Sequence, residues 1–193
     1  MEILLAVGIG VGLASVAGVR AFLPLLLALV LASFGYFEPS ASFLDAIGGW
    51  EGIGVVVPFA ALAVLEIVLD KIKAVERTFN ILMVPVRAIS GALLAAALAT
   101  EASLLPWLVV GGVIAGAVAV LKVLLRPPAR GTSSGVSTSF LSLIEDLVGL
   151  IGGAMAFFVP LLPALLVAFL LFFFSRIRKR RGRKFGGLRI LGD

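Results

Sequence analysis

Cysteine, histidine and charged side chains are absent or scarce in this 193-residue chain. Without cysteine it forms no disulfide framework and has no thiolate nucleophile. Without histidine it lacks the usual metal ligand and the side chain that titrates near neutral pH. Any proton transfer by side chains therefore falls to the carboxylates.

The same absences narrow the functional classes. Zinc proteases, thiol enzymes and Ser-His triads are excluded, because each needs histidine or cysteine. The phosphate-binding pattern GxxxxGK[ST] does not occur, so a P-loop has no support. The sequence therefore predicts a protein that is not an enzyme and has no metal site and no cofactor.

Charge is low and hydrophobicity is high. Charged residues make up 14% of the chain and hydrophobic ones 61%, with a mean hydropathy of +1.20, whereas a soluble domain has about 25% charged residues. A membrane-crossing helix needs about 20 apolar residues. Charges and prolines divide the chain into about six such spans and predict an all-α, polytopic transmembrane helix bundle. The spans are residues 3–35, 53–71, 85–100, 104–124, 137–157 and 160–176.

Two further segments are expected at the membrane surface. Residues 73–84 mix charges with an apolar face and predict an amphipathic helix lying at the interface. Residues 40–52 form a short link in which Trp50 suits the headgroup level.

The distribution of basic residues predicts the orientation. The linker 36–52 has no basic residue, whereas lysine and arginine follow the second and fourth spans and fill the C-terminal tail. The positive-inside rule then places these basic loops and the C-terminus in the cytoplasm. We expect a transmembrane domain over 1–176 and a basic cytoplasmic tail over 177–193. The tail should bind anionic lipid of the bilayer, and nucleic acid is not expected as a partner.

The first hydrophobic run is too long for one span. Thirty-three helical residues would measure about 50 Å, so the helix must be broken, and Pro24 places the break at Gly18 to Pro24. Residues 3–17 either re-enter the membrane or cross it separately, which would give seven spans and an outside N-terminus. Glycine faces here suit close helix packing or a homodimer. A weak internal repeat pairs the stretch from Val19 with that from Val86.

Charges within the predicted spans are the candidate functional residues. An isolated charge in the bilayer costs about 2.5 to 3.5 kcal/mol, so such residues usually face a partner, water or the bundle interior. In one interpretation Glu66 pairs with Arg20 or Arg87 as a packing tie; in the other the charges bind a substrate. The candidate substrate-binding residues are Arg20, Glu66, Asp70, Arg87, Glu145 and Asp146.

A second candidate site lies where the fifth span begins. Hydroxyl groups, free backbone N–H groups and arginines there could hold a phosphate, such as a lipid headgroup. The residues are Arg126, Arg130, Ser137, Thr138 and Ser139. The alternative is an ordinary capped helix start, since Ser142 and Glu145 have the spacing of a capping box.

Three blocks of the chain resemble a known family. The stretches "GVRAFLPLLLALVLASFG", "LAVLEIVLDKIKAVERTFNILMVPVRAISGALLAAAL" and "SGVSTSFLSLIEDLVGL", within residues 5–175, are similar in that order to domain of unknown function family 4126. The resemblance implies a small multi-pass protein of the bacterial plasma membrane and supplies no activity. The basic tail is not part of it.

Two functions are compatible with these patterns. The first is a small transporter or a protein that handles lipids or anions, with a charged site inside the membrane. The second is a structural or accessory membrane protein whose buried charges hold the helices together and whose tail binds lipid or a cytoplasmic partner. Broken helices with several intramembrane charges favour transport.

Overall fold

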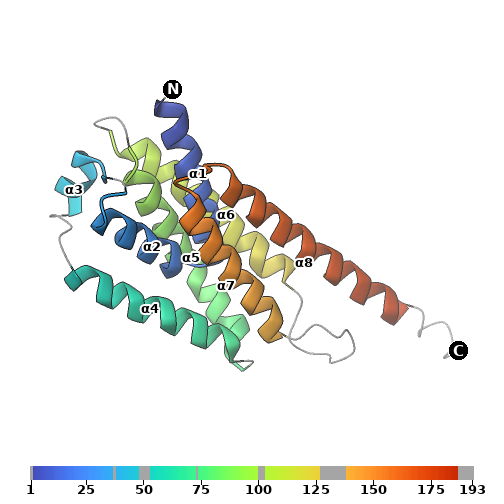
Figure 1. The fold of residues 1–193 in the computed structure, drawn as a ribbon. Coiled ribbons are helices and arrows are strands. Elements are labelled where there is room, and N and C mark those ends of the chain that lie inside the picture. Colours follow the sequence, from blue (N-terminus) through green and yellow to red (C-terminus); the bar gives the residue numbers. More distant parts are fainter. Residues whose placement is uncertain are drawn as a thin grey trace, which may run out of the picture.

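A computed structural model describes residues 2–36, 38–47, 53–72, 74–99, 103–126 and 138–186. In these residues the chain forms eight α-helices and no strand (Figure 1), which confirms the all-α fold class. The helices are α1 (Glu2–Val19), α2 (Phe22–Ser33), α3 (Ala41–Ile47), α4 (Ile53–Lys71), α5 (Glu76–Ala96), α6 (Leu105–Leu125), α7 (Thr138–Met155) and α8 (Leu162–Gly186).

The first hydrophobic run is broken inside the predicted interval. α1 ends at Val19, α2 begins at Phe22, and the two residues between them are not helical. Pro24 lies in the first turn of α2, where a backbone N–H would have no partner within the helix. Figure 1 shows the chain reversing here, so that α2 runs back toward the end of the bundle where α1 begins.

α1 is the central helix of the bundle. It contacts α2, α5, α6, α7 and α8, and its residues from Gly12 to Val19 are all buried. Its glycines permit this close packing, as predicted: a side chain at Gly12 would collide with the backbone of Pro160, and one at Gly18 with the side chain of Val118. The C-terminal half of α1 therefore lies in the protein interior.

The prediction of a surface helix over 73–84 followed by a span from residue 85 is wrong. Both segments belong to α5, which continues through Pro85 without ending. Its polar residues Glu76 and Asn80 are buried on the same face as Arg87. The polar stripe thus faces other helices. The pattern that suggested a helix at the membrane surface arises because the polar face of α5 is buried in the bundle and its apolar face is turned outward.

The remaining helices lie close to the predicted segments. α6 matches the predicted span 104–124 within a residue, and α8 begins near residue 160 but continues to Gly186. The ends of α4 and α6 and the starts of α5 and α7 gather at one end of the bundle (Figure 1). Trp50 lies outside the described residues.

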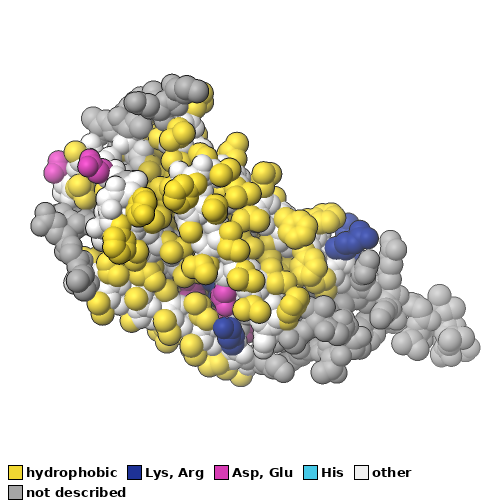
Figure 2. All heavy atoms as spheres, viewed as in Figure 1, with side chains coloured by type: hydrophobic (Ala, Val, Ile, Leu, Met, Phe, Trp, Pro, Cys, Tyr) yellow, Lys and Arg dark blue, Asp and Glu magenta, His cyan; other side chains and the backbone are white. Residues whose placement is uncertain are grey.

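The outward-facing side chains are largely hydrophobic. Val64, Val113 and Phe169 are each at least 60% exposed. Figure 2 shows hydrophobic side chains over most of one face, interrupted by a small patch of acidic and basic ones. By length and composition α5 and α6 could cross a membrane, and α1 and α2 are shorter apolar helices.

A buried charge network at the helix break

Charged side chains from five parts of the chain meet where α1 ends. They come from the break, α4, α5, α6 with the residue after it, and α7. Five are basic and five acidic, so the formal charge of the group is zero. We call it the buried charge network: Arg20, Lys71, Arg87, Lys122, Arg126, Glu66, Asp70, Glu76, Glu145 and Asp146.

Helical spacing brings these residues together. In α5 the network residues Glu76 and Arg87 and the polar Asn80 and Ser90 follow one another at intervals of four, seven and three residues, which keeps them on one helix face. Glu66 and Asp70 share a face of α4 in the same way, as predicted, and both are buried. Each helix thus turns its polar stripe toward the end of α1.

Arg20 makes its contacts through one nitrogen. Its Nη2 lies 2.9 Å from Asp70 Oδ2 and 2.7 Å from Asp146 Oδ1, and it donates a hydrogen bond of 2.9 Å to Ser142 Oγ. Glu145 Oε2 is 3.7 Å away. The side chain of Arg20 is completely buried. All three carboxylates lie at Nη2, and Nε and Nη1 have no hydrogen-bond partner.

Arg126 uses all of its guanidinium nitrogens. Nη1 and Nη2 donate to the two oxygens of Asp70 at 2.9 and 3.2 Å, and Nη1 also donates to Glu145 Oε2 at 3.1 Å. Nε lies 3.0 Å from Glu76 Oε1 in an ion pair without hydrogen-bond alignment. Burial alone would lower the pKa of Arg126, but Glu145 and Asp70 together raise it. This residue ties α4, α5 and α7 together, with both Nη atoms hydrogen-bonded and Nε in an ion pair.

Arg87 continues the network toward α4. Its Nη2 donates to Asn80 Oδ1 at 3.0 Å and to Glu66 Oε1 at 3.5 Å. Asn80 in turn donates to Asp70 Oδ1 at 2.6 Å, so Arg87 and Arg20 are linked through Asn80 and Asp70. The predicted pairing of Glu66 with Arg87 is confirmed, whereas the partner of Arg20 on α4 is Asp70.

The network also binds the backbone at the break. Glu66 accepts hydrogen bonds from the N–H groups of Ala21 and Phe22, both at 3.1 Å. Lys122 Nζ donates to the carbonyl of Val19 at 2.8 Å, and Ser90 Oγ donates to that of Ala21 at 2.6 Å. Broken helices expose backbone groups that are costly to bury unpaired. Here an acid satisfies the start of α2 and a lysine satisfies the end of α1.

Several buried polar atoms have no hydrogen-bond partner. They include Nε and Nη1 of both Arg20 and Arg87, and Oε1 of Glu145. All three side chains are 0% exposed. Buried polar groups nearly always have a partner, and exceptions often mark a water or ion site or a functional group. The unused donors of Arg20 and Arg87 are therefore the chemically distinctive feature of the network.

The network meets the surface at one ion pair. Lys71 Nζ lies 3.5 Å from Asp146 Oδ2, and these side chains are 42% and 14% exposed. The other charged members are at most 9% exposed. Because Asp146 also contacts Arg20, the pair connects the surface to the interior by a single side chain.

All six candidate substrate-binding residues belong to the buried charge network. Sequence reasoning did not include Lys71, Glu76 and Lys122 among the candidate site residues. Glu76 lay in the predicted surface helix over 73–84, and the two lysines were counted among the basic residues at the cytoplasmic ends of the second and fourth spans. Sequence reasoning also missed the neutral residues Asn80 and Ser90. The sequence did contain a signal for the residues of α5. Their spacing from Glu76 to Ser90 places them on one face of a helix.

The second candidate site is only partly described. Arg126 lies in the network, but Ser139 is exposed. Arg130, Ser137 and the side chain of Thr138 lie outside the described residues. The predicted capping box is wrong, because α7 begins at Thr138 and Ser142 lies inside the helix, where its hydroxyl accepts from Arg20.

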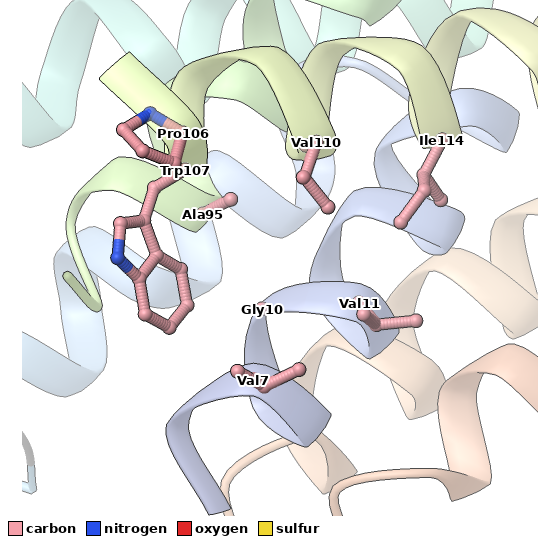
Figure 3. Close-up of a pocket in the computed structure, with 9 residues that line it drawn as sticks. Val7, Gly10, Val11, Ala95, Pro106, Trp107, Val110 and Ile114 are labelled. Carbon is pink, nitrogen blue, oxygen red and sulfur yellow. The ribbon is translucent and has the colours of Figure 1, made fainter. Parts of the chain in front are cut away.

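A groove elsewhere on the bundle is apolar. It measures about 210 Å³ and lies between α1, the end of α5 and the start of α6 (Figure 3). Its lining includes Val7, Gly10 and Trp107 and no charged side chain. The groove is therefore separate from the network. Within the described residues, no group of three or more acidic side chains is arranged to hold a metal ion.

Comparisons with known proteins place the chain in a family. A search of curated proteins and a search of solved structures return no match. The profile of the family DUF4126, a domain of unknown function, matches residues 7–180. This range includes every residue of the buried charge network. The chain therefore belongs to the DUF4126 family, as the three sequence blocks indicated.

Proposed function

We propose that the protein is a polytopic protein of the bacterial plasma membrane with its C-terminus in the cytoplasm. The support is its inverted polarity: hydrophobic side chains face outward, while charged side chains gather inside, the reverse of a soluble domain. In this arrangement α1 and α4 to α8 cross the bilayer. α2 has 12 residues, about 18 Å, and is a half-helix that returns outward. The N-terminus then lies outside.

We further propose that the buried charge network binds a small oxyanion and that the protein is a transporter or lipid-handling protein for it. The observation that carries this is the set of unpartnered donors on Arg20 and Arg87. Guanidinium groups bind carboxylate, phosphate and sulfonate groups through N–H groups of this kind. A half-helix beside the site is common in transporters. The Lys71–Asp146 pair marks the inner mouth.

The oxyanion could be a free ion or a lipid headgroup, since both present the same oxygens. A reconstitution experiment separates them. Protein in phosphatidylcholine liposomes, with and without phosphatidylglycerol, is assayed for uptake of labelled phosphate and for movement of fluorescent phosphatidylglycerol between leaflets. Phosphate uptake assigns the site to a free anion, and leaflet exchange assigns it to a lipid.

Substitutions test whether the network carries the activity. Arg20→Gln and Arg87→Gln should abolish it, while Arg178→Gln, at an exposed arginine on α8, should leave it unchanged. Binding of methanesulfonate to the detergent-solubilised protein gives a second measurement. Absence of uptake, leaflet exchange and binding in the wild-type protein would contradict the proposal.

A structural role is the second candidate, and a specific observation favours it. Glu66, Lys122 and Ser90 satisfy the backbone of the helix break, so these contacts would be needed in a passive bundle too. Under this alternative Glu66→Gln and Arg20→Gln lower only the amount of folded protein. The wild-type protein then shows no anion-dependent change in thermal stability.

A further inference from the structure

The charge balance of the buried charge network restricts how an anion can enter it. Five basic and five acidic side chains already neutralise each other. An added anion would leave an uncompensated negative charge in a low-dielectric interior, which is strongly unfavourable. Three carboxylates, those of Asp70, Glu145 and Asp146, also lie close to Nη2 of Arg20. An anion therefore needs a compensating positive charge, and a proton bound by one of the carboxylates of the network would supply it.

The carboxylates differ in their capacity to accept that proton. Both oxygens of Asp70 are held by cations or Asn80, and those of Glu66 hold the start of α2. Asp146 uses one oxygen for Arg20 and the other for Lys71. Protonating any of these breaks a contact that orders the site.

Glu145 is arranged differently. Its Oε2 lies 2.7 Å from Lys122 Nζ and 3.1 Å from Arg126 Nη1, whereas Oε1 is buried without a partner. A proton on Oε1 leaves Oε2 able to accept a hydrogen bond from Arg126 and to stay against Lys122 Nζ. It also creates a hydroxyl donor on a side chain whose Oε2 lies 3.7 Å from Arg20 Nη2. On the side of α7 that faces α8, the described side chains of α8 are apolar, such as Phe174. The charged groups around Glu145 from other elements are Arg20, Asp70, Glu76, Arg87, Lys122 and Arg126, and Asp146 is its neighbour on α7.

We propose that binding of an oxyanion at Arg20 and Arg87 is coupled to protonation of Glu145, so that one proton accompanies each monovalent anion. The proton comes from water at the Lys71–Asp146 pair and forms an O–H bond at Glu145 Oε1. It returns to water when the anion leaves. This inference rests on the proposed function and assigns its coupling ion.

Methanesulfonate is a suitable probe, because its single charge does not change with pH. Its binding to the purified wild-type protein is measured by calorimetry over a range of pH and in buffers of different ionisation enthalpy. Uptake of one proton per anion gives an affinity that falls about tenfold per pH unit wherever the anion-free protein must take up that proton, by linkage. The buffer dependence of the heat should then correspond to one proton.

Glu145→Gln and Glu76→Gln form a matched pair of variants. Each parent has one unpartnered oxygen, Glu145 Oε1 and Glu76 Oε2, but among the described residues the carboxylate of Glu76 pairs with Arg126 alone. Glu145→Gln should bind the anion with no pH dependence and no proton uptake, while Glu76→Gln keeps both. Infrared difference spectra of the wild-type protein offer a test that needs no variant, because anion binding should create the C=O band of a protonated carboxylic acid.

The outcomes separate this inference from the proposed function. Binding without proton uptake, or without the infrared band, overturns the coupling and leaves the anion site intact. Proton uptake that persists in Glu145→Gln overturns the assignment to this residue. No binding at any pH overturns both.

Discussion

Arg126 and Arg20 lie in the same network and differ in how fully they are used. Arg126 contacts Asp70, Glu76 and Glu145 through its three guanidinium nitrogens. Arg20 contacts all its partners through Nη2. A guanidinium whose three nitrogens all contact carboxylates is best explained as a tie. One that contacts them through a single nitrogen is a tie whose other two nitrogens could also bind a ligand. The two roles predict different effects of substitution.

Replacing Arg126 by lysine tests the tie. The charge is kept, but a single ammonium cannot span both oxygens of Asp70 and reach Glu76. We expect a loss of about 1–3 kcal/mol in the free energy of unfolding, because buried acceptors lose their partners. Denaturant unfolding in detergent measures it.

Arg178→Lys is the control for this change, since Arg178 is exposed on α8 and should change stability by less than about 0.5 kcal/mol. If Arg126→Lys were as stable as Arg178→Lys, the contacts of Arg126 would not be ties.

Sequence reasoning identified most network residues but not the contacts between them. An acidic or basic residue in an apolar run is visible in the sequence, which is why Arg20, Glu66 and Glu145 were found. Lys122 stands near the end of an apolar run and was counted among the basic residues that set the orientation, and only the fold shows its bond to the carbonyl of Val19. Such contacts join residues about a hundred positions apart, where no local pattern reports them.

At the scale of elements, the break and α5 show what local patterns can and cannot decide. The break was predictable because proline and an excess of length act locally. The continuity of α5 was not predictable. In the sequence, a polar stripe from Glu76 to Arg87 looks the same whether it faces headgroups or other buried charges. Which of the two the stripe faces depends on residues far away in the sequence, on α4, α6 and α7.

The α5–α6 pair gives a prediction at this scale. Gly91 of α5 packs on Ala115 and Gly111 of α6. A Cβ atom at position 91 would collide with Ala115 Cβ and lie 2.9 Å from the carbonyl oxygen of Gly111. Gly91→Ala should therefore push the helices apart and cost about 1–3 kcal/mol. Thermal unfolding in detergent measures the difference.

Gly116→Ala is the matched control in the same helix pair. A methyl group there would lie 3.5 Å from Ala88 Cβ, an ordinary contact. Alanine also favours the helix by up to about 1 kcal/mol over glycine, so this variant should be neutral or more stable. Equal effects of the two substitutions would mean that the close approach at Gly91 contributes nothing.

At the scale of the whole molecule, the charges are inside and the hydrophobic side chains outside. Within the described residues, nine of the ten members of the buried charge network are at most 14% exposed in their side chains. In water such a distribution would expose large apolar surfaces that favour aggregation. In a bilayer it places the apolar surface against lipid and the charges against each other. Overall hydrophobicity predicts a bilayer environment, whereas which side chains face outward and which face inward could be read only from the fold.

The absence of cysteine makes this arrangement directly testable, since any introduced cysteine is the only thiol. Tyr36 lies after α2 and is 66% exposed, Val113 lies in the middle of α6 and is 65% exposed, and Arg178 is exposed on α8. We expect a membrane-impermeant maleimide to label Tyr36→Cys in intact spheroplasts and Arg178→Cys only after permeabilisation. Val113→Cys should resist labelling in both conditions, because lipid covers it despite its exposure in the fold.

Leu4→Cys separates the two topologies of the first segment. Leu4 is 78% exposed near the start of α1, at the end of the bundle toward which α2 returns (Figure 1). If α1 crosses the membrane, Leu4→Cys is labelled from outside, together with Tyr36→Cys. If residues 3–17 re-enter from the cytoplasmic side, it is labelled only after permeabilisation, together with Arg178→Cys. Labelling of Val113→Cys as strong as that of Tyr36→Cys would show that the apolar surface faces water and that the membrane assignment is wrong.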